Sequence, residues 1–342
     1  MKKIRVIVVD DSALIRGVFK EILESDSAIE VIAVAHDPID AREKIKKLNP
    51  DVITLDIEMP KMDGLSFLEK IMSLRPMPVV MVSSLTQKGA SQTLKALELG
   101  AVDYVTKTGS GSFDIDRLGD DLIGKVKAAA RAKIMFRPKK NLEKKPKIVD
   151  SCNYKKYSLV VIGSSTGGVE ALREVFTHMP KDIPPILVTQ HMPSAFTGTF
   201  AKRLNSLCEP EVKEAKNGEI IEGGKIYIAP GNLHLTVKKA GGVYKCRVED
   251  GELVSGHKPS VDMLFESVAE IGKNTVGVIL TGMGKDGAGG LLKMKKAGAK
   301  TLGQDENSSL VYGMPKAAYM AGAVDRQVSL KEMAKEILKT CT

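Results

Sequence analysis

Short apolar runs alternate along this chain with segments in which apolar residues recur every three or four positions. In the first part of the chain the apolar runs occupy residues 4–9, 31–34, 52–55, 79–82 and 103–106. The helical patterns between them have the spacing of βαβ units. The pattern therefore predicts a small doubly wound α/β domain over residues 1–134, with five strands, five helices and a last helix beginning near Asp114.

The same alternation resumes at about residue 156. Apolar runs suggest strands near 159–162, 186–189, 226–229, 276–280 and 301–303. Between residues 212 and 254 polar and apolar positions alternate one by one, and Gly-Gly pairs stand at 223–224 and 241–242. These features predict an antiparallel hairpin attached to a second, mostly parallel sheet. The fold class is therefore α/β, with two doubly wound domains, the second over residues 156–342.

Charge separates the two domains. The net charge of the chain is +9, yet residues 125–156 alone carry +10 and the remainder carries −1. Lysine pairs and two prolines in this stretch predict a basic flexible linker over residues 135–155. A nucleic-acid or lipid-binding arm is the alternative interpretation of the basic stretch.

Composition narrows the class of protein further. Aromatic residues make up 4% of the chain and tryptophan is absent, so aliphatic residues must form the cores. The four cysteines stand far apart and favour neither a zinc site nor a disulfide framework. The N-terminus is too short for a signal peptide, and no apolar run is long enough to span a membrane. We expect a cytoplasmic protein that is not inserted in a membrane.

Polar residues stand at the carboxyl ends of the predicted strands of the first domain. They are Asp10 and Asp11 after the first strand, Asp56 after the third, Ser83 after the fourth and Lys107 after the fifth. Taken singly, each could be a cap, a turn residue or a solvated side chain. Three clustered carboxylates would raise one another's pKa values unless a cation joined them, and oxygen ligands suit Mg²⁺. A metal-bound carboxylate beside a lysine can accept a phosphoryl group.

Residues 1–134 resemble the flavodoxin-like receiver domain of bacterial response regulators. The motifs that carry the resemblance are VVDDS at 8–12, LDIEMPKMDG at 55–64 and GAVDYVTK at 100–107. The resemblance implies phosphorylation of Asp56, with Mg²⁺ bound by Asp10, Asp11, Asp56 and the Glu58 carbonyl. It also implies that Lys107 contacts the phosphoryl group while Ser83 and Tyr104 relay its presence. Receivers usually have proline after this lysine, and here Thr108 takes its place.

A second set of chemically active residue types follows three strands of the second domain. Ser165 lies in the run GSSTGG at 163–168, with glycine two positions before and two after it, as in a nucleophile elbow. His191 and Asp286 follow two further apolar runs. Functional residues gather at this edge of a parallel sheet, so the three types predict a Ser-His-Asp triad. The order along the chain differs from that of the α/β-hydrolases.

Each triad position has a rival. Ser164 is a second hydroxyl beside Ser165, although only Ser165 has both flanking glycines. His257 is the rival base and could instead contact substrate at the rim. Asp262 and Asp305 are rival acids that suit helix caps. Three further histidines, His36, His178 and His234, are expected to be surface, capping or structural residues. The glycine-rich loop could alternatively bind a nucleotide phosphate, but it has neither a G-x-G-x-x-G pattern nor a P-loop lysine.

Residues from about 156 onward are similar to the Rossmann-like catalytic domain of chemotaxis protein-glutamate methylesterases, the CheB family. The matching blocks are IGSSTGG at 162–168, QHM at 190–192, APG at 229–231, HKPSVD at 257–262 and TGMGKDG at 281–287. The resemblance implies hydrolysis of γ-glutamyl methyl esters on chemoreceptors, with deamidation of receptor glutamines as a second activity. The oxyanion donors would be the backbone N–H groups of Thr166, which follows the nucleophile, and Met283, which matches the family pattern.

Partners and regulation follow from the two resemblances together. Methylated chemoreceptors would be the substrate and a chemotaxis histidine kinase the phosphodonor; the esterase reaction itself would need no cofactor. We expect a monomer that does not bind nucleic acid, because the second domain has neither a helix-turn-helix pattern nor a basic excess. Some 20 linker residues span about 25 Å, which would allow the unphosphorylated receiver to cover the active site.

Overall fold

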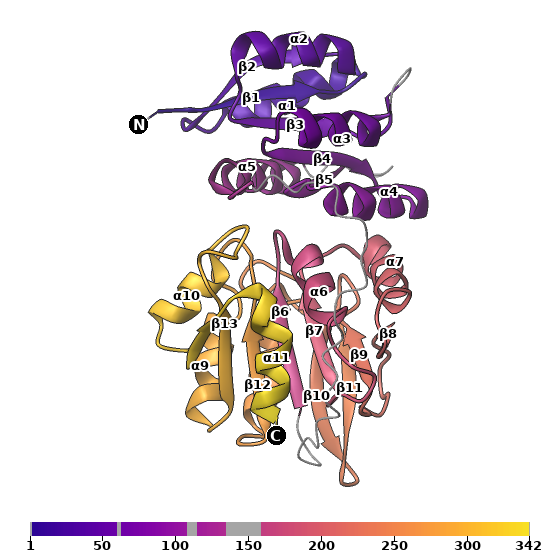
Figure 1. Ribbon diagram of the computed structural model, residues 1–342, viewed down its shortest axis with the longest axis vertical. Helices are drawn as coiled ribbons and strands as arrows, with labels where there is room; N and C mark the ends of the chain where they lie inside the picture. Colours follow the sequence, from indigo (N-terminus) through magenta and orange to yellow (C-terminus); the bar gives the residue numbers. More distant parts are fainter. Residues whose placement is uncertain (1, 60–62, 108–114, 135–158, 342) are drawn as a thin grey trace. The chain divides into compact units, whose positions relative to one another are not determined.

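The first part of the chain folds into a five-stranded parallel sheet in the order β2-β1-β3-β4-β5 (Figure 1). This is the strand order of flavodoxin-like domains, as predicted. The strands are β1 (Ile4–Val9), β2 (Ile29–Ala35), β3 (Val52–Asp56), β4 (Val79–Ser84) and β5 (Asp103–Lys107). The helices are α1 (Ala13–Glu24), α2 (Pro38–Leu48), α3 (Gly64–Leu74), α4 (Gln87–Glu98) and α5 (Ile115–Arg131).

The computed structural model describes residues 2–59, 63–107, 115–134 and 159–341. The chain divides into two units, Met1–Asn141 and Leu142–Thr342. The predicted linker over 135–155, the start of the last helix near Asp114, and Thr108 all lie outside the described residues. Within the described residues, no helix combines the length and the apolar character that crossing a membrane requires.

Residues other than Asp10, Asp11 and Asp56 cap the helices α1 and α3 of the first unit. The side chain of Ser12, not of Asp10 or Asp11, caps α1 by accepting a hydrogen bond from the Ile15 N–H. Asp63 caps α3 in the same way. Asp10 directly follows β1 and Asp56 ends β3; the Asp10 carboxylate accepts from the Ser12 N–H at 2.9 Å, and neither residue is the N-cap of α1 or α3.

The second unit is built on a seven-stranded parallel sheet in the order β14-β13-β12-β6-β7-β9-β8. Its central strands are β6 (Leu159–Ser164), β7 (Ile186–Gln190), β9 (Lys225–Ile228), β12 (Thr275–Ile279) and β13 (Lys300–Gln304). The sequence pattern missed the two edge strands, β8 (Glu211–Glu214) and β14 (Arg326–Val328). Both are short and mostly exposed or half-buried, so they lack the continuous apolar run that marks a buried parallel strand.

The predicted hairpin is present as β10 (His234–Ala240) and β11 (Val243–Glu249), but it forms a two-stranded sheet of its own. It is attached in two places: the Val237 N–H donates to the Ser267 hydroxyl of α8 (Val261–Ala269) at 3.0 Å, and β11 exchanges backbone hydrogen bonds with residues 218–221. A face with alternating polar residues suits a sheet that is covered on one side only.

Helices cover both faces of the larger sheet. Besides α8 they are α6 (Gly168–Phe176), α7 (Ser194–Asn205), α9 (Ala288–Lys296), α10 (Met314–Met320) and α11 (Leu330–Cys341). α8 packs against α9, whereas α6 packs against α11, on the opposite face from α9 (Figure 1). The α8–α9 face holds a core that includes the fully buried Leu159, Phe265 and Leu291. The carboxyl ends of β6, β7 and β12 thus emerge between well-packed layers.

Candidate active site and acidic cluster

The nucleophile elbow joins β6 to α6. The strand ends at Ser164, and Gly167 adopts a left-handed conformation (φ +77°) as the N-cap of α6. Ser165 is therefore the first residue beyond the strand, and its side chain is partly exposed. Its N–H donates to the carbonyl of Thr281 at 3.0 Å, which fastens the elbow to the segment after β12.

Ser164, the rival nucleophile, is held in a buried hydrogen bond. Its side chain is fully buried, and its hydroxyl donates to Oε1 of Gln190 at 2.8 Å. The Nε2 of Gln190 donates to the carbonyls of Ser165 at 3.0 Å and His191 at 3.1 Å. Gln190 thus ties the serine loop to the histidine loop, a role that sequence analysis missed. The position of Gln190 directly before His191 was the available signal.

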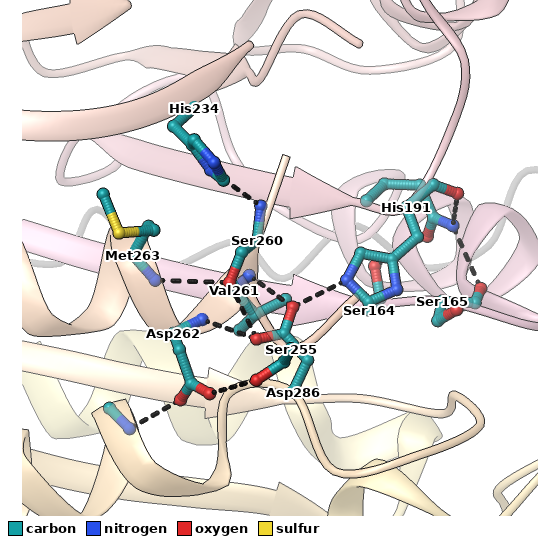
Figure 2. Close-up of polar contacts among 12 residues, drawn as sticks. Ser164, Ser165, His191, His234, Ser255, Ser260, Val261, Asp262, Met263 and Asp286 are labelled. Atoms are coloured by element: carbon teal, nitrogen blue, oxygen red, sulfur yellow. Dashed lines mark hydrogen bonds and ion pairs between the residues drawn. The ribbon is translucent and has the colours of Figure 1, made fainter. Parts of the chain in front are cut away.

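His191 and Asp286 meet as a hydrogen-bonded pair (Figure 2). Nε2 of His191 lies 2.8 Å from Oδ2 of Asp286. The other ring nitrogen, Nδ1, is buried and has no hydrogen-bond partner among the described residues. Figure 2 shows it on the side of the ring toward Ser164 and Ser165. The two nitrogens are exchanged relative to the serine-protease template, in which the aspartate accepts from Nδ1–H. Nδ1 is left to accept the proton of a nucleophile.

The N-terminus of α8 surrounds Asp286 with donors. The Ser260 hydroxyl lies 2.8 Å from Oδ1, and the N–H groups of Val261 and Asp262 donate at 2.7 and 3.0 Å. Burial disfavours the carboxylate, but the bond and charge of His191 and these N–H groups outweigh it and lower the pKa of Asp286 to about 2. Sequence analysis missed Ser260, which also caps α8. Asp286 is therefore fixed and ionised at neutral pH.

The rival acids, Asp262 and Asp305, accept hydrogen bonds from groups other than His191 in the described part of the chain. Asp262 accepts from the Gly290 N–H at 2.7 Å and from the Ser255 hydroxyl at 3.2 Å, and so joins α8 to α9. Asp305 accepts from the N–H and hydroxyl of Ser308 within a turn. The rival base, His257, does reach the site, because its ring stacks on that of His191 with centroids 3.7 Å apart and planes at 17°.

The remaining histidines make local contacts. His36 lies 3.0 Å from Asp40 on the receiver surface, and His178 contacts the Glu174 carbonyl at 2.6 Å near the end of α6. His234 accepts from the N–H of Ser260 at 3.3 Å, and its other nitrogen lies 2.8 Å from the Glu252 carbonyl. It supports the α8 N-cap.

The two candidate oxyanion donors lie in turns that meet at Ser165. Thr166 follows Ser165 in the elbow and is buried. Met283 lies between Gly282 and Gly284, whose φ is +87°. A Cβ on Gly282 would lie 2.8 Å from the Cβ of Ser165, so only glycine permits this approach. The Met283 N–H donates to no acceptor within the described residues, which leaves it available to a ligand.

The acidic residues of the first unit gather as a cluster. Carboxylate oxygens of Asp10, Asp11 and Asp56 all lie within 4.8 Å of one another. The Lys107 Nζ is 2.9 Å from Asp10 and 2.8 Å from Asp56. Burial and the charge of Asp10 prevail over this lysine and raise the pKa of Asp56 to about 6. A cluster of hard oxygen ligands with this electrostatic strain is consistent with Mg²⁺ binding.

The other receiver residues named from sequence lie around this cluster or in the core beside it. Ser83 is buried and accepts from the Thr93 hydroxyl at 2.7 Å. Tyr104 is buried beneath Lys125, whose Nζ is 5.0 Å from the ring centroid, and burial raises its pKa well above the ordinary value. Glu58 is exposed, and its N–H donates to Asp56. Sequence analysis missed Arg16, which donates to the carbonyls of Asp10 and Asp11 at 2.8 and 2.9 Å.

A flavodoxin-like sheet with an acidic cluster, followed by an α/β unit with a serine elbow, defines a receiver-linked hydrolase. Residues 6–118 match the family model of the response regulator receiver domain, and residues 160–337 match that of CheB methylesterase. The chain belongs to the CheB methylesterase family. The predicted family and fold class are thereby confirmed.

Two relatives match nearly the whole chain, and a solved structure matches about half of it. The protein-glutamate methylesterase/protein-glutamine glutaminase of Sulfurimonas denitrificans is 55% identical over 330 residues, which cover 94% of each chain. The protein of the same name from Rhizobium etli is 55% identical over 338 residues, 98% of this chain and 96% of the relative. The crystal structure of the Thermotoga maritima CheB methylesterase catalytic domain is 39% identical, covers 53% of this chain and 97% of its own, and gives a TM-score of 0.52.

Proposed function

We propose that this chain hydrolyses γ-glutamyl methyl esters on chemoreceptors, and deamidates receptor glutamines, under the control of its receiver domain. The observation that carries the proposal is the His191–Asp286 pair, whose unpartnered Nδ1 faces the side of the site where the elbow lies. The names of relatives that are 55% identical over nearly the whole chain support the substrate class.

In the proposed reaction Ser165 is the nucleophile. Its Oγ attacks the ester carbonyl carbon while Nδ1 of His191 takes the hydroxyl proton, and the anionic Asp286 stabilises the resulting imidazolium. The N–H groups of Thr166 and Met283 stabilise the oxyanion, and each such donor is worth about 3 kcal/mol. The proton on His191 then passes to the departing methoxide and releases methanol. Water then hydrolyses the acyl-enzyme by the same proton transfers. With a glutamine amide as substrate, the leaving group of the first step is ammonia in place of methanol.

In the receiver we propose Asp56 as the phosphoryl acceptor, with a histidine kinase as donor. Asp10, Asp11, Asp56 and the Glu58 carbonyl would hold Mg²⁺, which when bound neutralises charge on the transferring phosphoryl group. Lys107, which already contacts Asp10 and Asp56, would contact that group. Ser83 and Tyr104 would relay its presence by changing their packing, and the chain would act as a monomer. The 4.8 Å carboxylate cluster and its contacts with Lys107 support these roles.

Methanol release from methylated receptor membranes tests the esterase assignment. Ser165→Ala should lower the rate by at least about 1,000-fold, since the nucleophile is lost. Ser164→Ala is the matched control: it removes a hydroxyl that is already bonded to Gln190, and it should keep activity within about tenfold of the parent. Loss of activity in Ser164→Ala with retention in Ser165→Ala would overturn the assignment.

A further inference from the structure

His257 covers one face of the His191 ring. The ring centroids are 3.7 Å apart and the planes are nearly parallel, at 17°. The surrounding loop is held at several points. Val254 and His257 exchange two backbone hydrogen bonds of 3.0 and 3.1 Å, and the Lys258 ammonium donates to Asp250 at 2.6 Å and to the Gly251 carbonyl at 2.8 Å. The His257 ring is therefore presented to His191 by a braced loop.

This contact completes the restraint of the His191 side chain. One ring nitrogen bonds to Asp286, and the backbone carbonyl of His191 is held by Gln190. With one face against His257, the imidazole cannot tilt toward that side unless the His257 loop moves. A displacement of about 1 Å at such a group can cost about 100-fold in rate.

We propose that His257 is a positioning residue for the hydrolysis, acting through its ring stacked on His191. The inference rests on the proposed function, in which His191 is the base. Besides restraining His191, the His257 ring has an electrostatic effect. The π face of a neutral imidazole favours the imidazolium that forms on His191, whereas a protonated His257 at this distance would oppose it.

The charged groups around the two rings set the direction of this effect. Asp286 faces the Nε2 edge of His191 at 2.8 Å. In the loop that carries His257, Lys258 forms an ion pair with Asp250, and the Ser255 hydroxyl donates to Asp262. The Asp286 carboxylate therefore favours the imidazolium that forms on His191 when this ring takes the proton of the nucleophile.

Two substitutions in the full chain test the proposal. His257→Phe keeps a flat ring that cannot titrate, and His257→Ala removes the ring. We expect Ala to lower kcat for methanol release by about 10- to 100-fold with a much smaller change in KM, and Phe to retain most of kcat. The imidazole proton resonances of His191, in a chain with five histidines, should move in both variants, because the ring stacked on His191 is changed or removed. Unchanged resonances of the other three histidines would show that the variants are folded.

Two outcomes would overturn the role of the ring. Equal loss of kcat in Phe and Ala would mean that a nitrogen of His257 is required, as for a base or a substrate contact. Wild-type kcat in Ala, with unmoved His191 resonances, would mean that the stacked ring does not position His191. Labelling of Ser165 by a fluorophosphonate separates the two proposals. Absence of labelling in the wild type would overturn the proposed function, and equal labelling rates in wild type and His257→Ala would overturn the positioning role alone.

Discussion

Asp56 and Asp286 are both buried carboxylates, yet their surroundings move their pKa values in opposite directions. Asp286 receives a hydroxyl and two backbone N–H groups besides the His191 ring, and its pKa falls to about 2. Asp56 shares a single ammonium, that of Lys107, with Asp10, and its pKa rises to about 6. Asp286 therefore stays ionised at neutral pH, whereas the ionised form of Asp56 needs a further cation to stabilise it.

This difference predicts how the stability of the receiver unit depends on pH. The pKa of Asp56 is higher in the folded state, about 6, than its ordinary value of 3.8. Folding therefore gains from the protonated form below about pH 4, and the gain is lost as the pH rises through 6. Without Mg²⁺, raising the pH from 5 to 7 should cost about 1 kcal/mol of unfolding free energy through Asp56.

In calorimetry of the wild type, the unfolding transition that Mg²⁺ shifts identifies the receiver unit. The pH dependence of that transition is then measured in the presence of a chelator. Asp56→Asn is the matched control, because it keeps the size of the side chain and removes the titrating group. Its unfolding should depend less steeply on pH, and Mg²⁺ should stabilise it less. The same pH slope in both proteins would show that Asp56 is not the group concerned.

Contacts between elements, more than turn geometry, explain the first glycine of the nucleophile elbow. Gly167 has the positive φ that a sharp strand-to-helix turn requires, whereas Gly163 is needed for space. A Cβ on Gly163 would lie 2.1 Å from Cγ1 of Val261, the first residue of α8. Strand β6 and helix α8 therefore touch at the point where α8 donates to Asp286. The contact between Gly163 and Val261 thus joins the strand that carries the serine elbow to the helix that holds Asp286.

Gly163→Ala should accordingly push α8 away from β6. We expect a loss of about 1–3 kcal/mol in unfolding free energy, as for other overpacked cores, and a fall in esterase activity. Adding Val261→Ala should restore part of both, because it removes the two methyl groups that clash. A double-mutant cycle of urea unfolding and methanol release measures the coupling. Purely additive losses would contradict the proposed contact.

The two units of the molecule carry two separate chemistries. The acidic cluster lies wholly within residues 1–141, and the Ser-His-Asp site lies wholly within residues 142–342. Under the proposed function, the sequence-based expectation is that the unphosphorylated receiver covers the active site and that phosphorylation weakens this contact.

Acetyl phosphate with Mg²⁺ should therefore raise the rate of methanol release by the full chain, and Asp56→Asn should abolish the response. If the receiver inhibits the site as proposed, a piece comprising residues 150–342 should be faster than the unphosphorylated full chain. Rates for the piece and the full chain can be compared on the same membrane preparation. Equal rates would rule out inhibition by the receiver, and stimulation of Asp56→Asn would place the phosphoryl group elsewhere.

Much of this architecture could be predicted from sequence because it depends on local patterns. Continuous apolar runs such as 159–162 identify buried parallel strands, and residues at their carboxyl ends share one edge of the sheet. The edge strands β8 and β14 were missed since they are short and only partly buried. The hairpin was found, but its separation from the larger sheet depends on packing against α8, which no local pattern encodes.

The sequence by itself determined the two α/β units, their family and the candidate residues Ser165, His191 and Asp286, because strand periodicity and motif spacing are local properties of the chain. Tertiary structure alone decided which hydroxyl is held by Gln190, which nitrogen of His191 meets Asp286, and that His257 stacks on the ring. Those choices depend on distances between side chains up to about a hundred positions apart, and such distances exist only once the sheet has brought its strand ends together.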